Sequence, residues 1–239
     1  MITAYVRLEV RRTLRDTGFA ISTVGIPVMM YLLFTNLGAD DGGYRTAGMV
    51  GMAAYGALGA ALSLGTGVAE DKSTGWLRQL RITSMTPRQV VTGRALTGAV
   101  VVLPAIAGVL LAGGLANGVR MAAWQWAAVA VTLWLGSLPF TLLGMGNGYR
   151  LTAQTTGAVN VACNLGLAVA GGLWFPVALF PDWLRTLSGY TPTNRFAELG
   201  VAVTDGRAPG AVALVVLAGW AALFGAYAAV SYRRSARTA

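Results

Sequence analysis

The residues of this chain whose types and spacing could support a specific interaction fall in one charged run between two long apolar stretches. Its members are Glu70, Asp71, Lys72, Gly75, Trp76, Leu77, Arg78, Leu80 and Arg81. Leu77 and Leu80 are three residues apart with Trp76 beside them, so a helix here would gather apolar side chains on one side and charges on the other. Such a charged run taken alone is typical of a solvated loop, but a partly helical segment between two membrane spans is also what a membrane protein would offer to a soluble partner.

The rest of the chain offers little for catalysis. It has no histidine and a single cysteine, Cys163, so it cannot form a serine-histidine or cysteine-histidine pair, a histidine metal site or an internal disulfide. It also lacks the G-x-x-x-x-G-K-[ST] phosphate loop. We therefore expect no catalytic residue, metal site or nucleotide site in this chain. Its function must be passive or must use energy supplied by another protein.

Composition indicates a membrane protein. Of 239 residues, 55% are hydrophobic and 11% are charged, whereas soluble domains carry about 25% charged residues. Six stretches approach or exceed the roughly 20 residues that span a bilayer. They are Thr17–Leu37, Thr46–Ala69, Ala95–Ala116, Ala123–Met145, Thr155–Phe175 and Gly210–Tyr232. The sequence predicts one all-α integral membrane domain over residues 1–239, with short loops.

The basic residues predict the orientation of these spans. With both termini on one side, 13 of the 18 Lys and Arg residues fall on that side. The excess marks the cytoplasmic side, which then holds the termini and residues 70–94. We do not expect nucleic-acid binding, because the basic residues flank spans and form no basic face on a soluble fold. Arg outnumbers Lys 17 to 1, which suggests a bacterial genome of high GC content.

Residues 1–16 form an amphipathic pattern ahead of the first span. The apolar side holds Ile2, Tyr5, Val6, Val10 and Leu14, and the basic side holds Arg7, Arg11, Arg12 and Arg15. This pattern predicts an interfacial helix on the cytoplasmic leaflet. A plain start to the first span is the alternative. The apolar run that follows is too long for the core of a signal peptide.

Two spans carry polar rows at helical spacing. The second has Tyr55 and Ser63 in a row with small residues, and the fifth has Thr156, Asn160 and Asn164. Amides are costly against lipid, so we expect this side to face protein or a wet cavity, as part of a translocation path through the membrane or of a seam between two subunits. Hydrogen bonds that only hold the helices together are the alternative.

The segment 176–200 separates the last two spans. It is too apolar for a free loop, yet Pro176, Pro181 and Pro192 interrupt it too often for a span. Pro181 followed by Trp183 and Leu184 predicts one short helix, and Pro192 a second. We expect both to dip into the outer leaflet as a re-entrant segment. An ordinary packed loop is the alternative.

In this order, these features resemble the membrane subunits of ABC-2 type exporters, the permeases of daunorubicin-resistance and related efflux systems. The resemblance covers essentially the full length. Its most specific part is the run from Glu70 to Arg81 followed by Thr86-Pro87, which is similar to the family's acidic-basic-x-x-Gly-x-Leu-x-x-Leu run near a Thr-Pro. Ser84 stands where a proline is frequent. The second match is the proline-broken outer segment.

The resemblance implies an ABC-2 (type V) exporter fold with six transmembrane helices, an interfacial helix at 1–16, a coupling-helix loop at 70–87 and re-entrant helices at 176–200. It also implies two permeases, each docked on a cytoplasmic ATPase subunit that binds ATP and Mg. In that arrangement Trp76, Leu77 and Leu80 would fill a groove of the ATPase. Glu70, Asp71, Arg78 and Arg81 would form ion pairs at its rim.

Other functions fit the sequence less well than an exporter subunit. A passive channel would not need a docking helix, and a structural membrane subunit would not require the re-entrant segment. An intramembrane enzyme would have no histidine and no buried carboxylate for catalysis. The few charges in the spans favour an apolar or amphipathic cargo, such as a drug, antibiotic or lipid, with polysaccharide as the alternative. We expect the protein in a bacterial inner membrane. We also expect it to form a dimer, either with a second copy or with a sister permease.

Overall fold

A computed structural model describes residues 2–37, 42–74 and 87–238, and every regular element in these ranges is a helix. In chain order these are α1 (Ile2–Leu14), α2 (Thr17–Ala20), the π-helical turn η1 (Ile21–Gly25), α3 (Ile26–Leu37), α4 (Gly42–Ser73), α6 (Pro87–Leu115), α7 (Ala123–Gly136), α8 (Leu138–Arg150), α9 (Ala153–Ala170), the 3-10 turn η2 (Val177–Leu179), α10 (Asp182–Ser188), α11 (Pro192–Thr204) and α12 (Ala211–Thr238).

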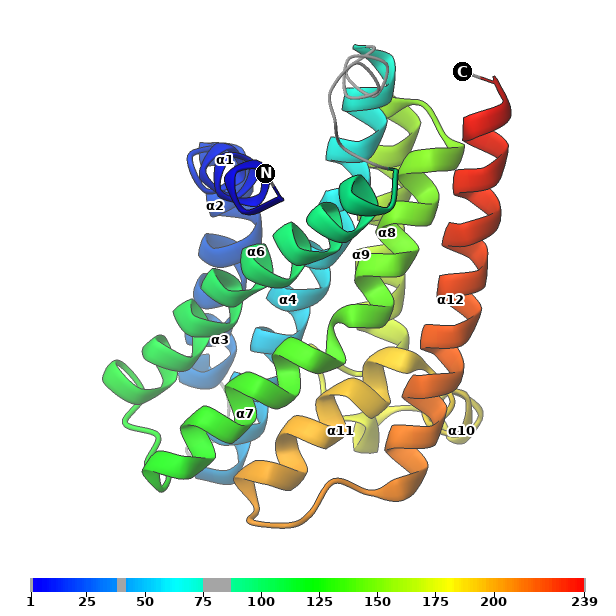
Figure 1. The fold of residues 1–239 in the computed structure, drawn as a ribbon. Coiled ribbons are helices and arrows are strands. Elements are labelled where there is room, and N and C mark those ends of the chain that lie inside the picture. Colours follow the sequence, from blue (N-terminus) through cyan, green and yellow to red (C-terminus); the bar gives the residue numbers. More distant parts are fainter. Residues whose placement is uncertain (1, 38–41, 75–86, 239) are drawn as a thin grey trace.

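The helices form an elongated bundle with two distinct ends (Figure 1). Both termini lie at one end, together with the C-terminal ends of α4 and α8. We call this the proximal end. The opposite, distal end holds α10, α11 and the connection between α6 and α7.

The first pass through the bundle is continuous from α2 through η1 to α3. The carboxylate of Asp16 starts it by accepting hydrogen bonds from the backbone N–H groups of Gly18 (2.9 Å) and Phe19 (3.3 Å). Only 17% of its most apolar 18-residue stretch is buried, and Met29 and Leu33 are exposed. This pass therefore lies on the outside of the bundle.

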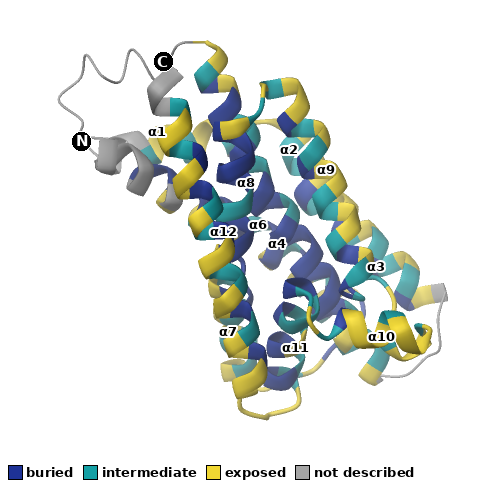
Figure 2. Ribbon diagram, turned by 90° about the vertical axis from the view of Figure 1, so that its right-hand side faces the viewer, coloured by how far each residue is buried: buried dark blue, intermediate teal, exposed yellow. Residues whose placement is uncertain are grey.

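Helix α4 forms the centre of the bundle (Figure 2), and 78% of its most apolar 18-residue stretch is buried. Glycines bring its backbone against that of α8. A Cβ at Gly65 would overlap the carbonyl oxygen of Gly144, and a Cβ at Gly144 would lie 2.7 Å from the carbonyl oxygen of Leu62. Because no side chain separates the two helices here, their backbones are in direct contact, as small residues allow in membrane bundles.

The predicted span Ala123–Met145 consists of two helices. The helix is interrupted at Ser137, whose hydroxyl donates to the carbonyl of Trp134 (2.7 Å). Pro139 lies in the first turn of α8. Proline supplies no backbone N–H and is tolerated at this position. The break lets α7 pack on α11 while α8 packs between α4 and α12.

The two short helices predicted near the distal end are present. Pro181 precedes α10, and Pro192 lies in the first turn of α11. Trp183 and Leu187 of α10 are 69% and 53% exposed, so the apolar side of this helix points away from the bundle (Figure 2). Helix α11 packs on α7, α12 and α4.

Among the described residues, five helical stretches are long and apolar enough to cross a membrane. They are Thr17–Asn36, Gly43–Ser73, Leu96–Leu115, Ala123–Arg150 and Ala211–Ser235. They correspond to predicted spans one to four and six, so the chain is an all-helical, multi-pass membrane protein.

The predicted fifth span, Thr155–Phe175, differs from the others. Its helix, α9, contains Gln154, Asn160 and Asn164, which lower its hydropathy, and it is not among the five. It ends at Ala170, not at Phe175, because Gly172 turns the chain at a φ of +70°.

Candidate functional site

The charged residues Glu70, Asp71 and Lys72 belong to the last turn of α4. The helix runs past the predicted span end at Ala69 and ends at Ser73, whose hydroxyl donates to the carbonyl of Glu70 (2.7 Å). The backbone N–H of Thr74 donates to the same carbonyl (2.9 Å). The predicted loop 70–87 therefore starts inside α4, and Pro87 is already the first residue of α6.

Six residues of the predicted docking run lie outside the described part of the chain. They are Gly75, Trp76, Leu77, Arg78, Leu80 and Arg81. Their docking role stays a prediction.

Asp71 is the centre of a buried ion-pair cluster. Its carboxylate pairs with the guanidinium of Arg94 on α6, and both side chains are almost fully buried, 4% and 2% exposed. Arg94 also approaches Glu9 of α1 (Nη1 to Oε1, 3.8 Å), and Arg12 of α1 approaches Asp71 (Nη1 to Oδ1, 3.7 Å). We call Glu9, Arg12, Asp71 and Arg94 the proximal cluster.

The proximal cluster joins three helices that are separate in sequence. Helix α1 packs on α6 and brings Glu9 and Arg12 to the end of α4. Gly67, one turn before Asp71, lies beside Arg94, whose Nη1 would be in ordinary contact, 3.6 Å, with a Cβ at that position. Asp71, Arg94 and Glu9 are buried or nearly so, whereas Arg12 is 63% exposed at the edge of the cluster. Such pairs are costly to break, because removing one partner leaves the other charge buried.

Lys72 contacts a different helix from Asp71. Its ammonium donates to the carbonyls of Gly148 (3.3 Å), Tyr149 (3.0 Å) and Leu151 (2.7 Å). These carbonyls lie at the C-terminal end of α8, where backbone acceptors lack partners within the helix and the helix dipole is negative. Neighbouring residues of α4 thus bind α1 and α6 in one case and α8 in the other.

These contacts change the expected role of Asp71. A rim ion pair with a partner protein needs an accessible carboxylate, and Asp71 is only 3% exposed because it is held inside the proximal cluster. Lys72 is likewise occupied by the end of α8. Glu70 is exposed and keeps the predicted rim role.

A second polar group lies deeper, between α4, α8, α9 and α12. The amide of Asn147 donates to Asn160 (Nδ2 to Oδ1, 2.9 Å) and accepts from the hydroxyl of Tyr227 (3.0 Å). Asn160 in turn donates to the carbonyl of Leu62 on α4 (2.8 Å). We call Asn147, Asn160 and Tyr227 the amide network. Asn147 and Asn160 are 4% and 5% exposed, so within this subunit Asn160 faces protein.

The remaining residues of the predicted polar rows differ in accessibility. Thr156 is fully buried and donates to the carbonyl of Thr152 (2.7 Å), and Tyr55 is buried with its ring edge-on to Trp174. Ser63 and Asn164 are half-buried. The Oδ1 of Asn164 accepts no hydrogen bond from the described residues, and its amide faces Gly59. The structure thus does not bring this set together into one exposed face.

The outer segment holds its predicted residues in two environments. Pro176 and Pro181 precede η2 and α10, where Trp183 is exposed and Leu184 is half-buried. Pro192 is buried at the start of α11. The prolines of this segment thus lie at the starts of its helices.

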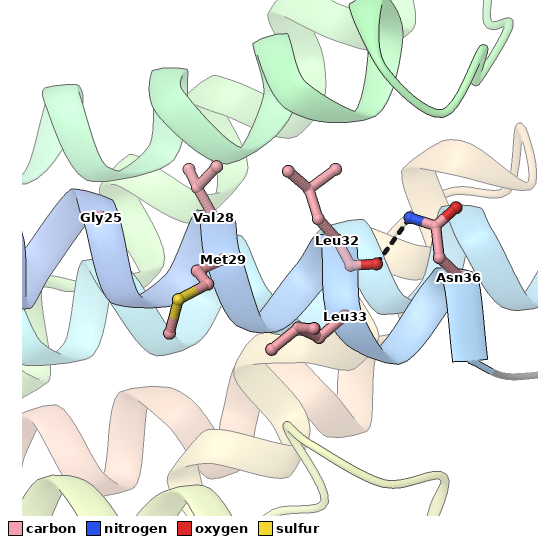
Figure 3. Close-up of a pocket in the computed structure, with 6 residues that line it drawn as sticks. All are labelled: Gly25, Val28, Met29, Leu32, Leu33 and Asn36. Carbon is pink, nitrogen blue, oxygen red and sulfur yellow. Dashed lines mark hydrogen bonds between the residues drawn. The ribbon is translucent and has the colours of Figure 1, made fainter.

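A shallow apolar groove runs along the outside of the first pass (Figure 3). Its volume is about 500 Å³, and Gly25, Val28, Met29, Leu32, Leu33 and Asn36 line it. The amide of Asn36 donates to the carbonyl of Leu32 (2.6 Å), so its polar group is satisfied within its own helix. No lining residue is charged. The groove therefore suits an acyl chain or an apolar helix and offers no chemistry.

Sequence reasoning missed the partners of the predicted residues. Arg12 and Arg94 were expected on the cytoplasmic side but in no site, and Glu9 had no expected partner, because ion pairs between distant helices leave no local pattern. Asn147 lies among glycines near the end of a span. An amide at such a position is a usable signal of a buried contact.

Comparison with known proteins agrees with this architecture. Residues 2–203 match the family described as ABC-2 type transporter. The chain is also 22% identical over 221 residues to a protein of Bacillus subtilis (strain 168) named "Putative transport permease YvfS", with 90% of each chain covered.

Proposed function

The chain belongs to the ABC-2 type transporter family, and we propose that it is the permease subunit of an ATP-driven exporter. It would move an apolar or amphipathic compound out of a bacterial cell, while a separate ATPase subunit binds ATP and Mg. The proximal cluster is the observation that carries this proposal. Its buried contacts hold the end of α4, through Asp71, and α6, through Arg94, and these two helices flank the charged segment that joins them.

The proposed topology has six spans in the inner membrane. Both termini lie at the proximal end in Figure 1, which requires an even number of passes, and α9 supplies the sixth beside the five apolar ones. The excess of basic residues assigns the proximal end to the cytoplasm. Exposed Trp183 and Leu187 of α10 then suit the outer interface, where tryptophan is enriched.

Coupling would occur at the segment that joins α4 to α6. Two ATPase subunits would each receive one such segment from a dimer of permeases, either two copies of this chain or this chain and a sister. Movement of the segment pulls on α4 at Asp71 and on α6 at Arg94 together, because this pair is buried and cannot separate cheaply.

The cargo route or the seam between permeases would involve residues that the subunit leaves accessible. Ser63 and Asn164 fulfil this condition, since both are half-buried. The Oδ1 of Asn164 is itself buried and accepts no hydrogen bond from the described residues, so it would gain a polar partner only when the helices around it move. Asn160, Thr156 and Tyr55 would support this side from the interior.

The docking role is tested by replacing Leu77 and Leu80 together with aspartate. We expect the double variant to reach the membrane but to lose its ATPase subunit. Burial of each leucine contributes roughly 1.5–3 kcal/mol, and a charge in the groove adds a desolvation cost. Co-purification with the tagged permease measures the effect, and methionine at both positions is the matched control. Recovery of the ATPase at wild-type yield by the aspartate variant would exclude docking through these leucines.

A further inference from the structure

We propose that Lys72 is a positioning residue that carries movement of the charged segment to α8, α9 and α12. This inference rests on the proposed function, because it needs an ATPase that moves the segment. Its structural basis is the contact between the Lys72 ammonium and the C-terminal end of α8, together with the amide network that begins one residue before that contact.

The geometry of the Lys72 contact suits an ammonium group. Lys72 is the only lysine in a chain with 18 basic residues. Its Nζ donates to three backbone carbonyls, those of Gly148, Tyr149 and Leu151, within 3.3 Å. An ammonium offers three donors around one atom, whereas the planar fork of arginine matches carboxylates better. Lysine is therefore the basic residue that suits three convergent carbonyls.

The contact continues directly into the interior of the bundle. Asn147 precedes Gly148 in the last turn of α8, and its side chain binds Asn160 of α9 and Tyr227 of α12. Buried hydrogen bonds of this kind are costly to leave unpaired. A displacement of the end of α8 is therefore expected to displace α9 and α12 as well.

Movement of the charged segment would reach different helices through Asp71 and through Lys72. Asp71 binds α6 and α1, and Lys72 binds α8, from consecutive positions in the last turn of α4. Loss of Lys72 should therefore uncouple α9 from the ATPase while docking of the ATPase continues. A residue that only stabilised the fold would not produce this separation.

The native thiol provides the probe, because Cys163 is the only cysteine and lies on α9 one turn after Asn160, half-buried. We would measure its labelling rate by N-ethylmaleimide in the permease–ATPase complex, without nucleotide and with ATP plus vanadate. In the wild type the two rates should differ about threefold or more, within the 2- to 30-fold range that coupling energies of about 0.5–2 kcal/mol correspond to.

The variants then decide the role of Lys72. Lys72→Met should make the labelling rates of Cys163 in the two nucleotide states equal, while the yield of co-purified ATPase is unchanged. Lys72→Arg keeps hydrogen-bond donors and should restore part of the difference between the two rates. Asn147→Ala removes a hydrogen bond to the Cys163 thiol and so changes both rates, but it should also abolish the difference between the two nucleotide states, and the double variant should add nothing to that loss. Ser73→Ala, an exposed change in the same turn at a residue with no assigned docking role, is the matched control. If Lys72→Met does not fold, Lys72→Gln takes its place.

Two results would overturn the inference. One is a folded, ATPase-bound Lys72→Met or Lys72→Gln variant that keeps the wild-type difference in rate. The other is a wild-type complex in which Cys163 reacts equally fast in both nucleotide states. If no ATPase co-purifies with the wild-type permease, the proposed function fails instead, so the two failures are distinguishable.

Discussion

Replacing Asp71 with leucine is expected to destabilise the folded permease by about 3–5 kcal/mol, because the buried guanidinium of Arg94 would keep only its longer contact to Glu9 (3.8 Å). Arg94→Leu should cost a similar amount. The double replacement by leucine should recover most of the loss, since an apolar pair of similar volume can substitute for a buried ion pair. Unfolding of the purified permease in detergent measures these differences.

The exposed pair Asp182–Arg185 of α10 supplies the control. Its side chains are 96% and 52% exposed, so Asp182→Leu should change stability by less than about 1 kcal/mol. Equal losses from Asp71→Leu and Asp182→Leu would contradict the burial of the proximal cluster. Additive losses in the double variant would contradict the pairing of Asp71 with Arg94.

Gly65→Ala is expected to destabilise the bundle although alanine favours helices. Its Cβ would overlap the carbonyl oxygen of Gly144, so α4 and α8 would have to separate. Overpacking of this kind typically costs about 1–3 kcal/mol. Thermal unfolding in detergent measures the loss.

The same substitution at open positions should have the opposite sign. A Cβ added at Gly157 of α9 or at Gly219 of α12 would meet no atom within 4 Å. Alanine there should stabilise by up to about 1 kcal/mol through helix propensity. A Gly65→Ala variant as stable as Gly157→Ala would show that the backbones of α4 and α8 do not touch.

Much of the fold could be predicted from apolar periodicity and from helix breakers. The spans around α3, α4, α6 and α12 follow from uninterrupted apolar runs, because a bilayer requires about 20 such residues. The starts of α10 and α11 follow from Pro181 and Pro192. The end of α9 could not be placed, because Gly171-Gly172 is followed by the apolar residues 173–175, which extend the hydrophobic run beyond the helix.

The candidate site could be located from the sequence but not assembled. The run after Ala69 stood out by its charge, yet a charge pattern does not say whether a group faces water or a buried partner. Asp71 and Arg94 are 23 positions apart, and the partners of Lys72 are backbone carbonyls that carry no residue signature. Only the packing of α4 against α6 and α8 decides these contacts.

The central claim, that the segment between α4 and α6 docks on an ATPase, is tested most directly by cross-linking. In a Cys163→Ala background, a cysteine replaces Gln79 in the charged run, and a second variant carries it at Ala208 in the distal connection between α11 and α12. A short thiol-to-amine cross-linker should join the ATPase to the permease from position 79 and not from position 208. A complex that co-purifies intact but gives no adduct from position 79, or gives one only from position 208, would contradict the account.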